Sequence, residues 1–354
     1  MQILSATEAV SPAIARTRLI LFTPFRAGRT RKLAATSYLS SIGTLFMPIP
    51  LVGLFFVPLI VRESGKHWLV WAVPAGILFL TALFLFLFVL CSQLQFAFFD
   101  IVLNRGEFVA PKWRQYRAPS LRWTRFKVIL GSALMVLVTS PIALWITHMV
   151  AISEAATTEH DVLPTSFFLF MFVAIGAYIG LLLWAWAMSV LNDFAVPFLA
   201  LEDITIADAL ERVKQLILRE RGQVALYAVM KDVLGFAGQM GISIVFQVVF
   251  GIISMILWLA GLAASQLLLQ AGVPSNIVTG LGFAVTIPLY LAYFVYCMPM
   301  IAGIVMTFLK SYSLYFLGGR YAVIGELLER STPPPSIPNY PPHSYLSPPP
   351  PPRS

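Results

Sequence analysis

Six long runs without a charged residue limit what this chain can fold into more than any other feature. In chain order they are 33–61, 68–99, 128–152, 164–192, 233–270 and 277–309. Each exceeds the roughly 20 apolar helical residues that cross a hydrocarbon core about 30 Å thick. Only 11% of all residues are charged, against about 25% in soluble domains. Because lipid offers no hydrogen bonds, backbone groups in such runs must pair within helices. The sequence therefore predicts an all-α, polytopic transmembrane helical bundle with about six spans.

The basic residues predict an orientation for these spans. Six crossings place 22 of the 24 Lys and Arg residues on one side of the membrane, and basic residues are retained on the cytoplasmic side. Both termini are therefore expected in the cytoplasm. The chain divides into a basic N-terminal segment (1–32), a six-span membrane domain (33–309), a cytoplasmic juxtamembrane segment (310–330) and a tail (331–354).

The fifth uncharged run leaves two alternatives open. It holds 38 residues, which is too many for one upright span and barely enough for two. A second span here would move the C-terminal basic residues to the outer side. We therefore expect one long, tilted helix.

Amphipathic stretches precede the pairs of spans and begin near Ser11, Pro111 and Thr205. Thr205 and Asp208 have the spacing of an N-terminal capping box, and apolar residues follow at helical spacing. Asp208 and Arg212 are placed as an i, i+4 ion pair. Helices of this kind lie in the headgroup plane, and their recurrence suggests a threefold repeat of about 95 residues.

Twelve basic residues in and beside the first two stretches are predicted to lie at the membrane surface. Trp residues interleave with some of them, as is typical of the interface of an anionic leaflet. The alternatives are ordinary topological anchoring and specific recognition of anionic lipids. The residues are Arg16, Arg18, Arg26, Arg29, Arg31, Lys32, Lys112, Arg114, Arg117, Arg122, Arg125 and Lys127.

Three charged residues lie closest to the predicted hydrocarbon region: Asp193, Lys231 and Asp232. Charges in a membrane suggest a functional site, whereas charges at the interface form local pairs, here Asp193 with Lys231. These are the candidate interfacial charges.

A second candidate is a strip of small and amide residues along the fifth run. Residues at this four-residue spacing either allow close helix packing or line a polar cavity. The polar strip consists of Gly235, Gln239, Ser243, Gln247 and Gly251.

No metal, nucleotide or nucleophile motif is visible, so no cofactor and no nucleic-acid partner is expected, and an enzyme is the least supported class. The tail has 11 prolines in 24 residues and is expected to be a disordered polyproline segment. It has the form of a ligand for a proline-binding protein, and a passive solvated tail is the alternative.

Three segments resemble a family of uncharacterised bacterial six-span membrane proteins. They read NDFAVPFLALEDITIADALERVKQLILRERG (192–222), ALYAVMKDVL (225–234) and SYSLYFLGG (311–319). A more distant resemblance is to the membrane domain of some bacterial glycerophosphoryl diester phosphodiesterases, whose catalytic domain this chain lacks. The resemblance implies a protein of the bacterial inner membrane. We expect a non-enzymatic, lipid-contacting scaffold or accessory subunit of the cell envelope, and a permease component is the alternative.

Overall fold

The computed structural model describes residues 2–44, 46, 53, 57, 66, 68–106, 108–155 and 163–331. Every regular element that runs through these residues is an α-helix, as the sequence predicts. The helices are α1 (Val10–Phe22), α2 (Ala27–Ile42), α5 (Leu69–Asn104), α6 (Val109–Gln115), α7 (Arg117–Ala155), α8 (Leu163–Leu201), α9 (Ile206–Arg219), α10 (Arg221–Gln270), α11 (Ser275–Gly318) and α12 (Ala322–Ser331).

Four helices in the described part of the chain are long and apolar enough to cross a membrane, which makes this a membrane protein. They are α5, Met171–Leu201 of α8, α10, and Ile277–Gly318 of α11. The fifth uncharged run lies within one continuous helix of 50 residues, as expected. The count of six spans stays a prediction.

The first uncharged run differs from the expected single span. Its first ten residues belong to α2, which ends at Ile42 and is followed by a turn at Gly43 and Thr44. These ten residues pack closely against α11. A Cβ atom on Gly303 would lie only 2.0 Å from the Ala34 carbonyl oxygen. The remainder of this run is mostly outside the described residues, as are residues 332–354 of the predicted polyproline tail.

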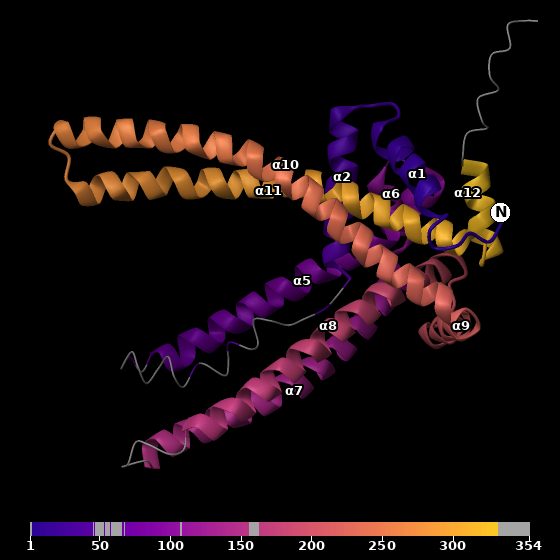
Figure 1. Ribbon diagram of the computed structural model, residues 1–354, viewed down its shortest axis with the longest axis horizontal. Coiled ribbons are helices and arrows are strands. Elements are labelled where there is room, and N and C mark those ends of the chain that lie inside the picture. Colours follow the sequence, from indigo (N-terminus) through magenta and orange to yellow (C-terminus); the bar gives the residue numbers. More distant parts are fainter. Residues whose placement is uncertain are drawn as a thin grey trace, which may run out of the picture.

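Long helices extend in one general direction from a compact end, which we call the hub (Figure 1). The hub comprises α1, α2, α6, α9, α12 and the adjoining ends of the long helices. One hairpin, α10–α11, turns at Ala271–Pro274, where Gly272 has a positive φ of 81°. Helices α7 and α8 run side by side as a second arm, and α5 forms a third.

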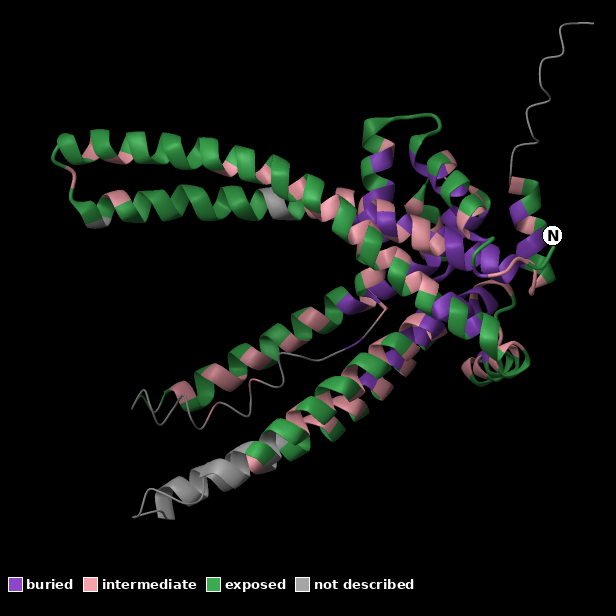
Figure 2. Cartoon of the chain, in the orientation of Figure 1, coloured by how far each residue is buried: buried purple, intermediate pink, exposed green. Residues whose placement is uncertain are grey.

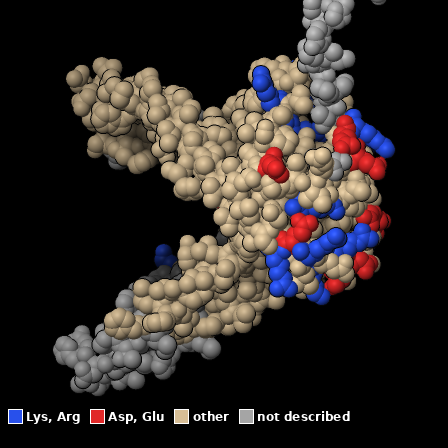
Figure 3. All heavy atoms as spheres, turned by 45° about the vertical axis from the view of Figure 1, so that its right-hand side comes forward, with Lys and Arg blue, Asp and Glu red and all other residues tan. Residues whose placement is uncertain are grey.

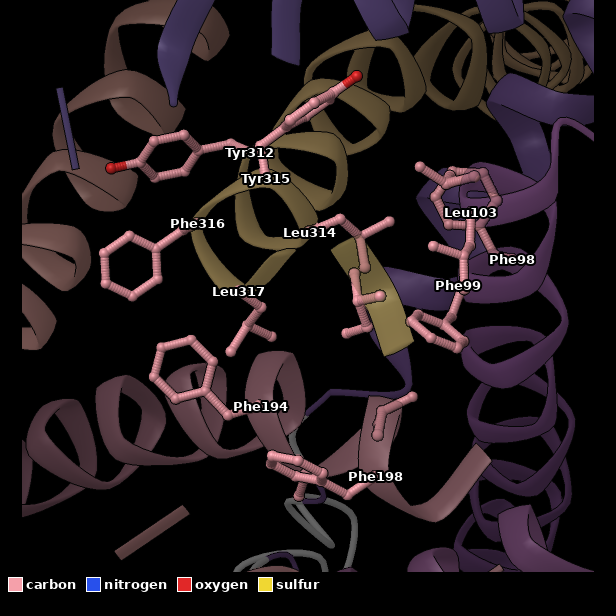
Figure 4. Close-up of a cluster of buried hydrophobic side chains, with 14 of the residues drawn as sticks. Phe98, Phe99, Leu103, Phe194, Phe198, Tyr312, Leu314, Tyr315, Phe316 and Leu317 are labelled. Atoms are coloured by element: carbon pink, nitrogen blue, oxygen red, sulfur yellow. The ribbon is translucent and has the colours of Figure 1, made fainter. Parts of the chain in front are cut away.

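Buried residues concentrate in the hub, and the arms are largely exposed (Figure 2). Aromatic rings from α5, α8 and α11 gather in the hub core (Figure 4), and Tyr227 of α10 belongs to the same cluster. The Tyr227 ring lies 5.2 Å from Phe194, 5.2 Å from Tyr312 and 4.5 Å from Phe316. Such pairs contribute about 0.5–1.5 kcal/mol each beyond area burial. The arms are therefore joined at their hub ends.

Surface helices occur where the sequence predicts them, beginning at Val10, Val109 and Ile206. The capping box of α9 is present, because the Thr205 hydroxyl oxygen accepts a hydrogen bond from the Asp208 backbone N–H at 3.2 Å. The expected pairing of Asp208 with Arg212 is not the one observed. Arg212 instead forms an ion pair with Glu202, 2.5 Å away.

Candidate functional site

Asp193 lies where α8, α10 and α11 meet, with only 10% of its side chain exposed. Its Oδ2 atom accepts hydrogen bonds from Lys231 Nζ and from the Tyr227 hydroxyl, the latter at 2.8 Å. Lys310 Nζ lies 3.6 Å from its Oδ1 atom. The predicted pair of Asp193 with Lys231 is thus present, and Asp232 is exposed. Two largely buried lysines share one carboxylate, so the formal charge of this trio is +1 when both lysines are protonated.

A pocket of about 420 Å³ adjoins this trio on the hub side of the arms. Its walls come from α2, α5, α8, α10 and α11. Phe98, Val196 and Phe236 supply apolar surface, while Asp193, Lys231, Asp232 and Lys310 supply charge. The uncharged polar residues that line it are Ser37, Ser40, Ser41, Thr44, Gln95, Ser189 and Asn192. This volume is in the range of small-molecule binding sites.

Arg16 is buried rather than at the membrane surface, which corrects the sequence-based assignment. It is 1% exposed. Its guanidinium donates hydrogen bonds to the carbonyl oxygens of Val102 (2.9 Å) and Leu103 (2.7 Å) and to the Ser331 hydroxyl (2.7 Å). The last four carbonyls of a helix lack intrahelical partners and favour a nearby cation. Arg16 therefore caps α5 and joins α1, α5 and α12.

Lys127 is likewise 1% exposed, so its assignment to the membrane surface was also wrong. Its ammonium group donates to the Gly43 carbonyl oxygen (2.5 Å), Ser92 Oγ (2.5 Å) and Gln95 Oε1 (2.9 Å). Gly43 is the residue that follows α2, so Lys127 satisfies a carbonyl at that helix end. A buried ammonium needs such acceptors, because leaving it unpaired is costly.

The other ten basic residues lie at or near the surface of the hub, where Figure 3 shows charged side chains gathered. Lys112 pairs with the buried Asp100 at 2.8 Å, and Arg122 pairs with Asp203. Arg31 donates to the Tyr296 hydroxyl at 2.7 Å. The exposed members of this set are Arg18, Arg26, Arg31, Lys32, Arg114, Arg117, Arg122 and Arg125, and Arg29 and Lys112 are half-buried.

The polar strip does not form one buried seam. Gly235 packs against α11, where an added Cβ atom would lie 3.2 Å from Leu309, and it also lines the pocket. Gln239 and Ser243 are half-buried, whereas Gln247 and Gly251 are exposed. The pocket therefore reaches only the hub end of the strip.

Glu202, just beyond α8, links two peripheral helices to the hub. It accepts hydrogen bonds from the Tyr321 hydroxyl at 2.5 Å and from Arg212 of α9. The bond from Tyr321 is the main reason that the pKa of Glu202 lies below its usual value, and the Arg212 bond acts in the same direction. Burial, together with the Glu202 carboxylate, raises the pKa of Tyr321. These two hydrogen bonds hold α9 and the start of α12 beside Glu202.

Asn192, Tyr227 and Lys310 also belong to the site and were not predicted from the sequence. Asn192 accepts a hydrogen bond from Trp123 Nε1 at 2.9 Å and donates to the Thr44 carbonyl oxygen at 2.9 Å. It thereby links α8 to α7 and to the end of α2. Its position next to Asp193, a candidate interfacial charge, could have indicated that Asn192 belongs to the site.

Two recurrent motifs could have revealed the buried lysines. Residues 127–131 and 231–235 both read K-x-x-L-G, and residues 92–95, 189–192 and 307–310 read S/T-x-L followed by Gln, Asn or Lys. In the structure, the lysine of each first motif donates a hydrogen bond to the serine that begins the second motif on the preceding arm. The lysine-to-serine bond occurs twice and the second motif three times, so the equivalence supports the threefold repeat in part.

Residues 4–325 match the family described as "Family of unknown function (DUF7544)". The chain belongs to this family. No curated protein and no solved structure matches it. Among the described residues, no group of three His, Cys, Asp or Glu side chains is placed to hold a metal ion.

Proposed function

We propose that this DUF7544 protein is a non-enzymatic, multi-pass protein of the bacterial inner membrane that serves as a lipid-contacting scaffold or accessory subunit of the cell envelope. The observation that carries this proposal is the exposure of the arms. In α10, none of the most apolar 18-residue window is buried within the protein. Exposed apolar area on this scale marks a surface for lipid or for a membrane partner. The arms therefore offer apolar surface to lipid or to a membrane partner.

Charge placement supports the proposed orientation of six spans with both termini in the cytoplasm. Charged side chains gather on the hub, and the start of the chain lies beside α12 (Figures 1 and 3). A hub on the cytoplasmic side agrees with the retention of basic residues there. Its exposed basic residues contact anionic headgroups, and the proline-rich tail is available to a protein partner.

The resemblance to the membrane domain of glycerophosphoryl diester phosphodiesterases remains part of the proposal and implies no activity. A permease component is the alternative function, and the pocket is the observation that favours it. A permease would need a hydrated route from this pocket along the arms. A lipid-contacting scaffold would instead have α10 covered by acyl chains beyond the pocket.

Spin labels on α10 distinguish the two functions. Each residue of the polar strip from Gln239 to Gly251 is changed to cysteine in a chain whose Cys91 and Cys297 are alanine, and the purified protein is placed in lipid nanodiscs. Collision rates with oxygen, which concentrates in lipid, and with a polar nickel chelate are then measured. The scaffold predicts high oxygen and low nickel accessibility at Gln247. An Asp232→Cys label should show the opposite pattern and serves as the control.

High nickel accessibility at Gln239, Ser243 and Gln247 would refute the scaffold and indicate a hydrated path.

A reporter pair tests the orientation separately. Alkaline phosphatase should be active when fused after Gly272 and inactive when fused after Arg330. Activity after Arg330 would refute the cytoplasmic C-terminus.

A further inference from the structure

One polar atom in the pocket wall lacks a hydrogen-bond partner in the part of the chain that the structure describes. The Ser37 side chain is fully buried, and its Oγ atom has no hydrogen-bond partner among the described residues. Ser37 lines the pocket beside other hydroxyl-bearing residues of α2. A buried hydroxyl without a partner costs free energy. A polar group bound in the pocket beside Ser37 would satisfy this hydroxyl.

The charges next to that hydroxyl select an anionic group. Lys231 and Lys310 line the pocket with 12% and 16% of their side chains exposed, and they share the single carboxylate of Asp193. The distance from Lys310 Nζ to that carboxylate is 3.6 Å, which is longer than a normal hydrogen bond, so this ammonium can donate to a closer acceptor. Asp232 also lines the pocket but is exposed, so water screens it more than the buried cations.

We propose that this pocket binds a phosphate group, held by Lys310 and Lys231 with the Ser37 hydroxyl as a further donor. Its apolar walls, including Phe98 and Phe236, suit the hydrocarbon attached to a phospholipid headgroup. The phosphate chemistry rests on the pocket alone, whereas the lipid source rests on the proposed function. If the pocket bound no phosphate, the proposed contact between the arms and lipid would still stand.

Native mass spectrometry of the full-length protein in detergent micelles tests the site. The probes are phosphatidylglycerol, phosphatidylethanolamine, inorganic phosphate and diacylglycerol, which is a lipid without phosphate. At least one phosphate-bearing probe should bind at least tenfold more tightly than diacylglycerol. K310Q should weaken that binding about tenfold or more, and S37A about fivefold. The control S265A, a serine-to-alanine change on α10 away from the pocket, should leave it unchanged.

S37A removes a hydroxyl that has no hydrogen-bond partner in the part of the chain that the structure describes, so it keeps the site testable if K310Q fails to fold. Tight binding of either phospholipid that excess inorganic phosphate does not displace identifies a lipid headgroup. Displacement by millimolar inorganic phosphate identifies free phosphate as the ligand class. Equal binding of diacylglycerol, or equal binding by the wild type and S37A, would overturn the proposal.

Discussion

Replacing Arg16 with glutamine should destabilise the hub far more than an ordinary surface substitution. The guanidinium is the donor to the carbonyl oxygens of Val102 and Leu103 near the end of α5 and to the Ser331 hydroxyl of α12. Glutamine is too short to reach all three. The Leu103 carbonyl keeps a hydrogen bond from the Ser331 hydroxyl at 3.0 Å. The buried Val102 carbonyl loses its donor, which costs about 1–3 kcal/mol.

The free energy of unfolding in mixed detergent micelles measures this effect. The matched control is Arg18→Gln, two residues away on the exposed side of α1, which should change the free energy by less than about 0.5 kcal/mol. Limited proteolysis should also cut near α12 sooner in the R16Q variant. If R16Q and R18Q were equally stable and differed from the wild type only in binding anionic vesicles, Arg16 would be a lipid-contacting residue and the capping argument would be wrong.

Two further predictions concern helix packing and acid stability. Gly303→Ala should lower the free energy of unfolding by about 1–3 kcal/mol or more, because the new Cβ atom would meet the Ala34 carbonyl at 2.0 Å. Gly280→Ala on the same helix has open space and should be neutral or stabilising, so equal losses would contradict the packing argument. Because the folded-state pKa of Glu202 is lowered, its contribution to stability is present above the usual value of 4.5 and is lost as pH falls through the lowered pKa. Unfolding titrations at decreasing pH should show a smaller acid-induced loss in Glu202→Gln, and an unchanged loss would exclude the contact with Tyr321 as its cause.

Much of the fold follows from local sequence properties. The long uncharged runs predict α5, α8, α10 and α11, and the distribution of basic residues favours one long helix over 233–270. The capping signal at Thr205 predicts the start of α9. These predictions are correct because hydropathy, periodicity and capping are set by residues within a few turns of one another.

The candidate site was less accessible to the same reasoning. Arg16 and Arg18 have similar sequence surroundings, yet the first is buried and the second exposed. The difference arises because Arg16 meets carbonyls 86 and 87 residues away. The pairing of Asp193 with Lys231 was predicted, since both stand at the ends of uncharged runs. The participation of Lys310 was not predicted, because only packing brings α11 to that carboxylate.

The sequence by itself determined that the chain is helical and belongs in a membrane, with its cations gathered toward one side. Each of these properties is a sum over neighbouring residues, and lipid enforces it whatever the helices later contact. The tertiary structure alone decided which cations bond to helix ends, which share Asp193 and where a pocket remains. These depend on three-dimensional contacts between unsatisfied groups on helices that are distant in sequence.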